Sequence, residues 1–244
     1  MITAFIIGIN GKMGKILCDA APVYGFNVSG GLDVAKTSEN VFTSATDVNV
    51  PYDVIIDFSR PASLDAVIAL AKRGNAPVVL ATTGYTDEQT QKIAELAKTV
   101  PVFKSANMSL GIAAVTAAIK TVKAILGDSF DVEILEKHHN QKVDVPSGTA
   151  LLLADAICPR ENQVVNRSGK RVAGELGITS IRGGTVVGEH EIGFYGDDEI
   201  ITVSHSARSR KLFAAGAYKA AEFLLSSPPA IYNMDDLIEK LNNN

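Results

Sequence analysis

Apolar and polar residues alternate in blocks through the first half of the chain. Four short, largely apolar runs are typical of buried strands: Ile2 to Ile9, Asp53 to Phe58, Pro77 to Ala81 and Val100 to Phe103. After the first run, apolar residues recur at helical spacing until Pro22 ends the pattern. Because strand and helix patterns follow each other with short connections, this half predicts a parallel sheet covered on both faces.

The pattern changes from about residue 109. The elements predicted beyond this point are an Ala-rich helix up to Gly127, a strand Asp131 to Leu135, a short helix Leu151 to Ala156, strands near 178–187, 189–195 and 199–205, and helices Leu212 to Leu225 and Asp235 to Leu241. The polar, basic segment Arg160 to Gly177 is predicted to be a loop. Strands that are grouped together indicate a second domain of a different class.

We therefore expect an α/β protein of two domains. Residues 1–108 and 216–244 would form a Rossmann-like, doubly wound parallel sheet that binds a dinucleotide. Residues 109–215 would form a smaller α+β domain with a mixed or antiparallel sheet. A chain of 244 residues, 46% of them hydrophobic, is long enough to bury two such cores.

Composition excludes several classes of function. Asp and Glu outnumber Lys and Arg by 27 to 23, and this net charge of −4 argues against binding nucleic acid by phosphate neutralisation. No run approaches the roughly 20 apolar residues of a membrane span, and residues 1–5 lack the features of a signal peptide. Cys18 and Cys158 are too few for a disulfide framework and lack metal-site spacing. We expect a cytoplasmic protein with no nucleic-acid or membrane partner.

A glycine-rich turn follows the first predicted strand. Gly8, Gly11 and Gly14 are spaced as GxxGxxG, whereas the commoner GxGxxG needs glycine where Ile9 stands. Such glycines let backbone N–H groups approach a pyrophosphate, and the helix N-terminus adds partial positive charge. The strand before and the helix after favour a dinucleotide site, with an ordinary tight turn as the alternative.

Asp33 lies where an acidic residue of a dinucleotide site binds the adenosine ribose. An acid at this position favours NADH because it repels a 2′-phosphate. Lys36 is close enough in sequence to offset that repulsion, so NADPH stays open as well. The alternative interpretation of Asp33 is a solvated turn residue.

Two further turns follow the third and fourth predicted strands, Thr82-Thr83-Gly84 and Ala106-Asn107-Met108-Ser109. Ligands of open α/β sheets bind at the carboxyl ends of the strands. Small hydroxyl and amide side chains at these turns could hold the nicotinamide ribose and carboxamide, or could serve the turns alone.

One segment of the second half, Glu136 to Ala150, gathers cationic and N–H donors. Its candidate ligand-binding residues are His138, His139, Lys142, Ser147, Gly148 and Thr149. Ser147 is a natural N-cap, so the N–H groups directly after it would open a helix and attract an anion. Cationic donors beside a helix N-terminus indicate a carboxylate or phosphate ligand, and a purely structural loop is the alternative.

Zinc is the rival interpretation of the histidine pair. Adjacent histidines point to opposite faces of a strand, and no Cys or third His stands at ligand spacing, so we expect no metal. His190 and His205 fall in alternating strands and are predicted to be hydrogen-bonded residues of the sheet.

The segment Glu136 to Ala150 resembles the signature of the 4-hydroxy-tetrahydrodipicolinate reductase (dihydrodipicolinate reductase) family, E-x-H-H-x-x-K-x-D-x-P-S-G-T-A. The resemblance spans nearly the whole chain. It also covers the V/I-G-x-x-G-x-M-G start, Asp57-Phe58-Ser59-Arg60-Pro61, the Thr-Thr-Gly turn, Asn107-Met108-Ser109, Arg182-Gly183-Gly184, Gly188-Glu189-His190, and His205 with Ser209-Arg210. Ala81 and Met108 depart from the family, which often has a glycine and an aromatic residue there.

The resemblance implies a reductase of diaminopimelate and lysine biosynthesis. The family reduces the cyclic product of dihydrodipicolinate synthase, with hydride going to ring carbon C4 and a proton to the neighbouring carbon. His138 would donate the proton, with Lys142 as a competing or assisting donor, because an imidazole titrates near neutrality. The two substrate carboxylates would be bound by His139, Lys142 and the helix start at Ser147, Gly148 and Thr149.

The resemblance also implies NADH or NADPH as cofactor. The residues expected to bind it are Gly8, Asn10, Gly11, Lys12, Met13, Gly14, Asp33, Phe58, Ser59, Arg60, Ala81, Thr82, Thr83, Gly84, Ala106, Asn107 and Met108. The implied partners are a small dicarboxylate substrate and three further copies of the chain. In this homotetramer, Ile178 to His205 would form the oligomer face.

Two other functions are weighed against this one. A nicotinamide-sensing binding protein could keep the fold and lose turnover, although the intact His138 and Lys142 argue against that. A semialdehyde dehydrogenase needs a reactive cysteine nucleophile, and Cys158 beside Pro159 is a poor candidate.

Overall fold

The computed structural model describes residues 1–243 and divides into two compact units. The first unit contains Met1–Leu110 together with the chain from Arg210 onward, and the second contains Gly111–Ser209. Residues 109–110 and 210–215 therefore belong to the first unit rather than the second. Residues 210–215 do so because they open a helix that packs against the first sheet. Asn244, the last residue of the predicted dinucleotide domain, lies outside the described residues.

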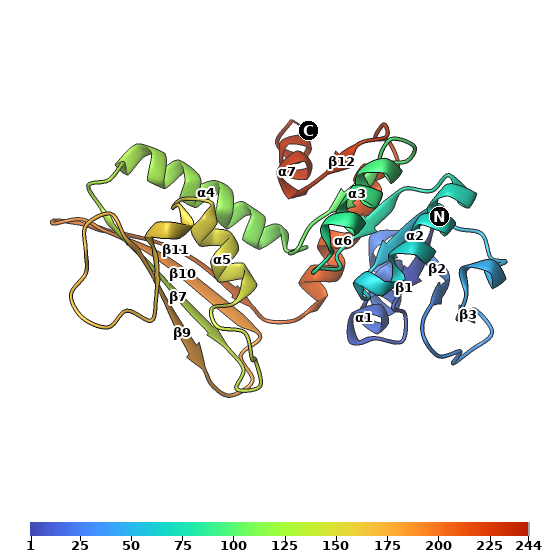
Figure 1. The fold of residues 1–244 in the computed structure, drawn as a ribbon, viewed down its shortest axis with the longest axis horizontal. Helices are drawn as coiled ribbons and strands as arrows, with labels where there is room; N and C mark the ends of the chain where they lie inside the picture. The colour runs from blue at the N-terminus through green and yellow to red at the C-terminus, as the bar shows by residue number, and fades with distance from the viewer. Residues whose placement is uncertain (244) are drawn as a thin grey trace. The chain divides into compact units, whose positions relative to one another are not determined.

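The first unit is built on a seven-stranded sheet in the order β12-β6-β5-β4-β1-β2-β3, with every neighbouring pair parallel (Figure 1). The strands are β1 (Ile2–Ile7), β2 (Phe26–Leu32), β3 (Val41–Phe42), β4 (Val54–Asp57), β5 (Val78–Leu80), β6 (Val102–Lys104) and β12 (Ile231–Tyr232). β4 and β5 are buried at every position, as expected for central parallel strands. The predicted doubly wound α/β class is confirmed.

Five helices accompany this sheet: α1 (Lys12–Ala20), α2 (Leu64–Gly74), α3 (Asp87–Leu96), α6 (Lys211–Leu224) and α7 (Met234–Asn242). A capping box of Thr86 and Gln89 starts α3. α6 returns to the first sheet late in the chain, and its fully buried Tyr218 donates a hydrogen bond to the Leu17 carbonyl at 2.8 Å. The first core is thereby completed by residues far from it in sequence.

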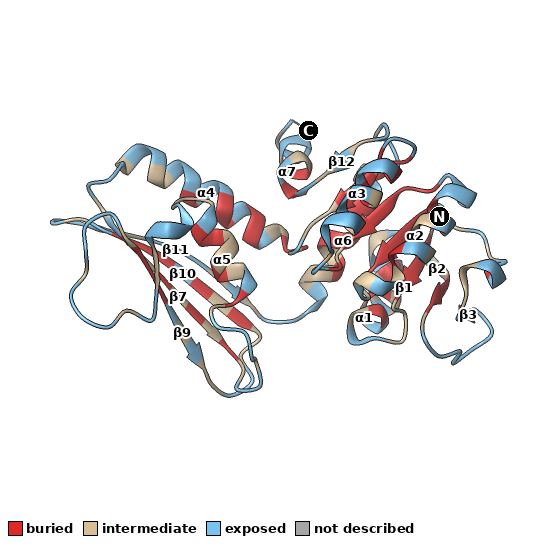
Figure 2. Cartoon of the chain, in the orientation of Figure 1, coloured by how far each residue is buried: buried red, intermediate tan, exposed pale blue. Residues whose placement is uncertain are grey.

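The second unit has a five-stranded mixed sheet in the order β11-β10-β7-β9-β8. Its elements are α4 (Leu110–Leu126), β7 (Asp131–His138), α5 (Gly148–Asp155), β8 (Gln163–Val165), β9 (Leu176–Arg182), β10 (Gly188–Tyr195) and β11 (Ile200–Ala207). Inward residues of the strands, such as Ile134 and Phe194, form one core with Ile119 of α4 and Leu153 of α5. Figure 2 shows the buried positions on these strands and helices.

Three differences from the predicted elements have physical causes. β7 extends to His138, beyond the predicted end at Leu135, because β10 pairs with it up to Lys137 and β9 pairs with it up to His138. β8 and the first residues of β9 lie in the segment 160–177 that was predicted to be a loop. β3 and β12 have two residues each, too few to show a period in the sequence.

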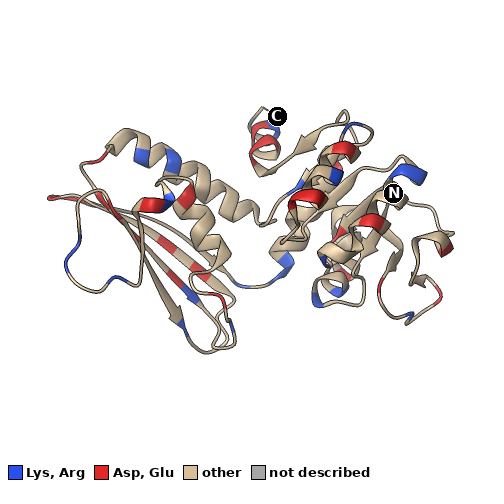
Figure 3. Ribbon diagram, in the orientation of Figure 1, with Lys and Arg blue, Asp and Glu red and all other residues tan. Residues whose placement is uncertain are grey.

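Ion pairs hold the rest of segment 160–177 against β7. Arg167 pairs with Glu133 at 2.6 Å and with Glu175, and Arg171 pairs with Glu133 at 2.5 Å. Figure 3 shows the basic positions of this segment on the loop that precedes β9. The basic residues that favoured a loop prediction therefore anchor the segment to the sheet. Among residues 1–243, no helix is both long and apolar enough to cross a membrane.

Candidate active site

The turn from β1 into α1 has the backbone geometry that its glycines permit. Gly8 has a φ of +82°, and a Cβ on Gly14 would lie only 2.3 Å from the Gly8 carbonyl oxygen. Gly11 is the N-cap of α1, so Lys12 and Met13 form its first turn. The start of α1 thus presents backbone N–H groups without side chains in front of them, which suits a pyrophosphate.

A cleft of about 500 Å³ lies over this turn in the first unit. Seven of the predicted cofactor residues line it: Gly8, Asn10, Gly11, Asp33, Phe58, Ser59 and Arg60. The glycine cradle, the open helix end and an acidic residue in one cleft fit a nicotinamide dinucleotide.

Asp33 orients the turn as well as lining the cleft. Its Oδ2 accepts a hydrogen bond from Asn10 N at 2.8 Å, and its Oδ1 accepts one from Val34 N at 2.7 Å. The Asn10 side chain in turn donates to Ala35 O and accepts from the Thr37 hydroxyl. Each carboxylate oxygen has further lone pairs, so the turn function and a ribose contact are compatible.

A buried carboxylate that was not predicted as a site residue, Asp57, connects two of the predicted turns. Its Oδ1 accepts hydrogen bonds from the Ser59 backbone at 3.0 Å and hydroxyl at 2.5 Å, and its Oδ2 accepts one from the Tyr85 hydroxyl at 3.2 Å. Ser59 N also donates to Thr82 Oγ1 at 3.0 Å. Burial raises the pKa of Asp57 above its ordinary value. Asp57 thus fixes the 57–60 turn against the end of β5.

The other predicted cofactor residues of the first unit lie on the turns after β5 and β6. Ala81 N donates to Asp57 O at 2.9 Å, Thr83 is exposed, and Gly84 has a φ of +81°. In the later turn Ala106 is exposed, and Asn107 Oδ1 accepts from Ser109 N at 2.9 Å.

Met108 is buried rather than part of an open surface. It is 2% exposed, and a Cβ on Gly216 of α6 would lie 1.7 Å from its carbonyl oxygen. α6 therefore packs with its backbone directly on this turn. The Asn107 turn is therefore packed against α6, a segment more than 100 residues away in sequence.

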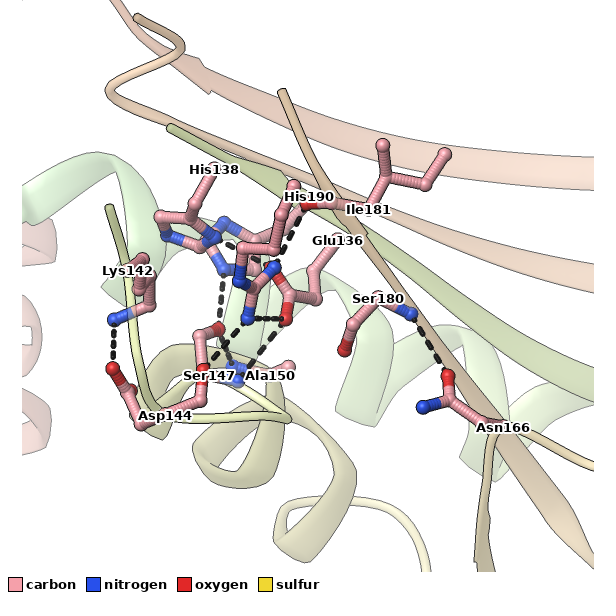
Figure 4. A network of polar contacts seen from close by, with 11 residues as sticks. Glu136, His138, Lys142, Asp144, Ser147, Ala150, Asn166, Ser180, Ile181 and His190 are labelled. Carbon is pink, nitrogen blue, oxygen red and sulfur yellow. Dashed lines mark hydrogen bonds and ion pairs between the residues drawn. The ribbon is translucent and has the colours of Figure 1, made fainter. Parts of the chain in front are cut away.

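The second unit holds a polar cluster at the carboxyl end of β7 (Figure 4). Glu136 is fully buried, and its Oε2 lies 2.5 Å from Nδ1 of His138, two residues further along the strand. Both guanidinium Nη atoms of Arg182 donate to the Glu136 carboxylate, at 2.7 and 2.8 Å. Ser147 N donates to the same carboxylate at 3.2 Å. The cluster therefore joins the ends of β7 and β9 to the start of α5.

The ionisation of this cluster follows from its partners. Burial raises the pKa of Glu136, but the hydrogen bonds from Arg182 and His138 outweigh it and lower that pKa to about 2. Burial lowers the pKa of His138, the Glu136 carboxylate raises it, and Lys142 and Arg182 lower it again, with a net downward shift. Glu136 is thus ionised at neutral pH, and His138 exchanges its proton below the usual range.

Ser147 caps α5 as predicted, and its hydroxyl is engaged within the protein. Its Oγ accepts from Ala150 N at 3.1 Å and lies 3.2 Å from Nε2 of His190. Burial and the charge of His138 lower the pKa of His190 to about 4, so this imidazole is neutral. His190 is a sheet residue as predicted, but the structure also brings it into the cluster, with its ring 5.2 Å from that of His138.

Lys142 and Asp144 lie on the loop between β7 and α5. Lys142 Nζ is 2.8 Å from Asp144 Oδ1. Burial raises the pKa of Asp144, but Lys142 and the Gly148 N–H outweigh it and lower the pKa. His139 is half-buried, and its carbonyl accepts from Lys142 N at 3.2 Å. Within this unit, His139, Lys142 and the α5 start at Gly148 and Thr149 lie on one continuous segment.

The structure groups the predicted ligand-binding residues with three that sequence reasoning left without a role, Glu136, Arg182 and His190. Each belongs to one of the motifs that carry the family resemblance, but no motif indicates that the three side chains meet in one cluster. The signal for Glu136 was its place in the alternating β7 pattern after Val132 and Ile134, where an apolar residue is expected. Among residues 1–243, no group of three or more His, Cys, Asp or Glu could hold a metal ion.

Known proteins share both units. The family model described as "Dihydrodipicolinate reductase, N-terminus" matches residues 2–108, and "Dihydrodipicolinate reductase, C-terminus" matches residues 111–238. The 4-hydroxy-tetrahydrodipicolinate reductase of Clostridium novyi is 46% identical, covering 99% of this chain and 100% of its own. That of Clostridium tetani is 44% identical, covering 98% and 97%.

A solved structure agrees on the fold. The dipicolinate-bound dihydrodipicolinate reductase from Paenisporosarcina sp. TG-14 superposes with a TM-score of 0.80 at 24% identity, covering 97% of this chain and 99% of that one. The sequence and fold matches cover both units from end to end. The chain belongs to the dihydrodipicolinate reductase family.

Proposed function

We propose that the chain reduces the cyclic product of dihydrodipicolinate synthase, (4-hydroxy-)dihydrodipicolinate, to tetrahydrodipicolinate with NADH or NADPH, and that His138 and Lys142 serve the proton-transfer step. This is the activity named for the clostridial relatives, and it places the chain in diaminopimelate and lysine biosynthesis. The observation that carries the assignment of roles is the buried Glu136–His138 pair beside the start of α5. The first unit, Met1–Leu110 with the chain from Arg210 onward, is assigned to the cofactor, and Gly111–Ser209 to the substrate.

The substrate is a dicarboxylate, and one segment supplies the groups that attract it. Lys142 provides a cation, His139 a second donor, and Gly148 and Thr149 the N–H groups at the start of α5. A related structure is described as dipicolinate-bound, which supports a small planar dicarboxylate here. The Ser147 hydroxyl is already engaged, so Ser147 contributes mainly by holding the helix start in place.

His138 is assigned as the proton donor. Its Nδ1 donates to the ionised Glu136, which leaves Nε2 to deliver a proton to the ring carbon next to the one that receives hydride. The substrate carboxylates bring negative charge toward His138, which favours its protonated form and offsets the downward shift of its pKa. Lys142 assists as a cation or as a second proton donor.

A nicotinamide cofactor would supply the hydride when bound in this cleft. Gly8 and Gly11 would hold its pyrophosphate at the start of α1, Gly14 would permit the tight turn beneath it, and Asp33 would accept from the adenosine ribose. The turns at Ser59, Thr82 and Asn107 are assigned to the nicotinamide half of the cofactor. Asp33 favours NADH and Lys36 offsets this, so both cofactors are expected to serve.

A cytoplasmic homotetramer is the assembly that we propose. The sheet face turned away from α4 and α5 carries exposed apolar side chains, Ile181, Tyr195 and Ile200, with exposed fractions of 45%, 40% and 61%. Apolar side chains on an uncovered sheet face support an interface within Ile178 to His205. Sedimentation of the purified protein tests this, with a monomer as the contrary outcome.

The test of the activity is loss of nicotinamide absorbance with freshly synthase-generated substrate, with NADH and NADPH run in parallel. Turnover with either is the expected result. In matched assays, Lys142→Ala should lose far more activity than Lys36→Ala, and His138→Gln should lower kcat while cofactor affinity stays nearly unchanged. Tight cofactor binding without any turnover would instead favour a nicotinamide-sensing protein.

A further inference from the structure

Glu136 is a charged residue where the strand otherwise places apolar side chains. The inward positions of β7 before His138 are Val132, Ile134 and Glu136, and the Glu136 side chain has no exposed surface. Replacing a buried ion pair by apolar residues of similar volume is often neutral or stabilising. Stability of the fold therefore does not explain the charge at this position, and the explanation has to come from the residues around Glu136.

Hydrogen bonds converge on the Glu136 carboxylate from three separate segments. Oε2 accepts from His138 Nδ1 and from Arg182 Nη1, and Oε1 accepts from Arg182 Nη2 and from Ser147 N. Arg182 Nη2 also donates to Asp144 O at 2.7 Å. One carboxylate thus joins the end of β7, the end of β9, the loop before α5 and the N-cap of α5.

The charge on Glu136 determines which nitrogen of His138 carries the exchangeable proton. An ionised carboxylate only accepts hydrogen bonds, so the ring nitrogen that faces it, Nδ1, is the protonated one in the neutral imidazole. Nε2 is then the atom that gains and loses the proton. A Cβ on Gly188 would lie 3.0 Å from this Nε2, so the glycine leaves room beside it.

Glu136 is also the negatively charged group among those that shift the pKa of His138. Arg182 from β9 and Lys142 from the loop are cations, and His190 from β10 is neutral. Asp144 faces Lys142 rather than the imidazole. Without Glu136, two cations and no anion would act on the protonated form of His138.

We infer that Glu136 is a positioning residue for proton transfer: its carboxylate, held by Arg182, fixes the Nδ1–H tautomer of His138 and sets the imidazole against the start of α5. Glu136 acts through His138 and stays ionised throughout. The proton leaves from Nε2 and forms the new C–H bond on the substrate ring, next to the carbon that accepts hydride from the nicotinamide. The inference rests on the proposed role of His138.

The test is the pH profile of kcat for Glu136→Gln, with both cofactors and synthase-generated substrate. We expect kcat to fall on the order of 100-fold, near the lower end of what general acid catalysis contributes. The pH at which kcat declines should move down by about 1–3 units, the effect of removing an opposite charge at this distance. An unchanged pH profile would overturn the inference.

Glu133→Gln is the matched control. Glu133 lies on the same strand and is also paired with arginines, Arg167 and Arg171, but three positions away from Glu136 and on the opposite face. This variant should keep the wild-type kcat and pH profile. An equal loss in both variants would mean that any broken ion pair on β7 weakens the fold, and would overturn a role specific to Glu136.

NMR of protein labelled at the histidine ring nitrogens covers the case in which Glu136→Gln does not fold. In the wild-type protein, with the signal assigned by comparison with His138→Gln, neutral His138 should carry its proton on Nδ1. A proton on Nε2 would contradict the inference without any change at Glu136. Absence of wild-type turnover contradicts the proposed function, whereas turnover with the wrong tautomer contradicts only the role of Glu136.

Discussion

Each of the two units buries one carboxylate completely near the carboxyl end of a central strand, and the two carboxylates differ in ionisation. Asp57 of β4 accepts hydrogen bonds from neutral groups of Ser59 and Tyr85, and burial raises its pKa. Glu136 of β7 is clamped by Arg182, and its pKa is lowered to about 2. Both side chains lack exposed surface, yet their pKa values shift in opposite directions, and the cation beside Glu136 is the largest cause that lowers its pKa.

The difference in ionisation corresponds to two different roles of the buried carboxylates. Asp57 needs only acceptor oxygens to hold the turn at Ser59 and the end of β5, and neutral donors are sufficient for that. Glu136 must remain an anion, because it acts on the charge and tautomer of His138. In this protein the buried acid with neutral partners holds a turn of the cofactor cleft in place. The buried acid with a cationic partner acts on the protonation of the neighbouring histidine.

The largest expected effect is that of Arg182→Met. It leaves a fully buried carboxylate without its cation, which costs about 3–5 kcal/mol of unfolding free energy. Arg160→Met is the control, because Arg160 pairs with Asp155 on the surface, with 78% of its side chain exposed against 17% for Arg182. That exposed pair should contribute far less than the Arg182–Glu136 pair. Urea unfolding measures the free energy of unfolding of both variants. Equal decreases in Arg182→Met and Arg160→Met would contradict the expected difference between the buried and the exposed pair.

Acid unfolding should show the next effect. The pKa of Glu136 falls from 4.5 in the unfolded chain to about 2 in the folded protein. Its contribution is therefore fully present above pH 4.5 and is lost as the pH falls toward 2, about 3 kcal/mol in all at 1.36 kcal/mol per unit. Unfolding free energy measured against pH should show this slope in the wild-type protein and not in Glu136→Gln. The same slope in both would mean that other carboxyl groups produce it.

Asp57→Asn should have a much smaller effect on stability. Asn resembles a protonated Asp in shape, and the Ser59 and Tyr85 hydroxyls can bond either group, so about 1 kcal/mol or less should be lost. The sign of its pH term is also opposite. The folded protein holds the Asp57 proton more tightly, so this contribution to stability falls as the pH rises above 3.8.

Thermal unfolding and NADH titration of Asp57→Asn, beside Glu136→Gln, check this contrast. The expected outcome is near wild-type stability and near wild-type NADH affinity for Asp57→Asn. A loss as large as that of Arg182→Met would show that Asp57 is held as a carboxylate, and the two buried acids would then be equivalent.

The sequence predicted those features that depend on neighbours along the chain. The glycine turn at Gly8 and the N-cap at Ser147 are local, and each was found. Contacts such as Arg182 with Glu136, 46 residues apart, depend on β7 pairing with β9 in one register. No local period encodes that register.

The same reason explains the other features that were not predicted. One neutral partner of Asp57, Tyr85, lies 28 residues away beyond a second strand, and His190 reaches Ser147 across 43 residues. The basic residues of segment 160–177 looked solvated because the acidic partner Glu133 is contributed by β7. Most of the longer elements could therefore be predicted from the sequence, whereas the side-chain partners that set ionisation could not.

A third carboxylate, Asp144, has a cation but little burial, and its removal should have the smallest effect on stability. Its side chain is 58% exposed, and Lys142 lies 2.8 Å away. An exposed pair of this kind contributes about 0.2–1 kcal/mol. Its effect on catalysis should be clearer, because Asp144 competes with a substrate carboxylate for Lys142. Asp144→Asn should therefore lower KM for the dicarboxylate and leave kcat nearly unchanged.

Steady-state kinetics of Asp144→Asn beside Asp128→Asn would decide this, since Asp128 is also 2.8 Å from a lysine, Lys123, and lies outside the cluster. The control should keep the wild-type KM. A raised KM in Asp144→Asn would mean that Asp144 positions Lys142 for the substrate instead of competing with it. Asp144 extends the comparison of Asp57 and Glu136 to an exposed carboxylate. A cation lowers the pKa of a carboxylate on the surface as well as in the core. Only for the buried carboxylate does loss of the cation cost much unfolding free energy.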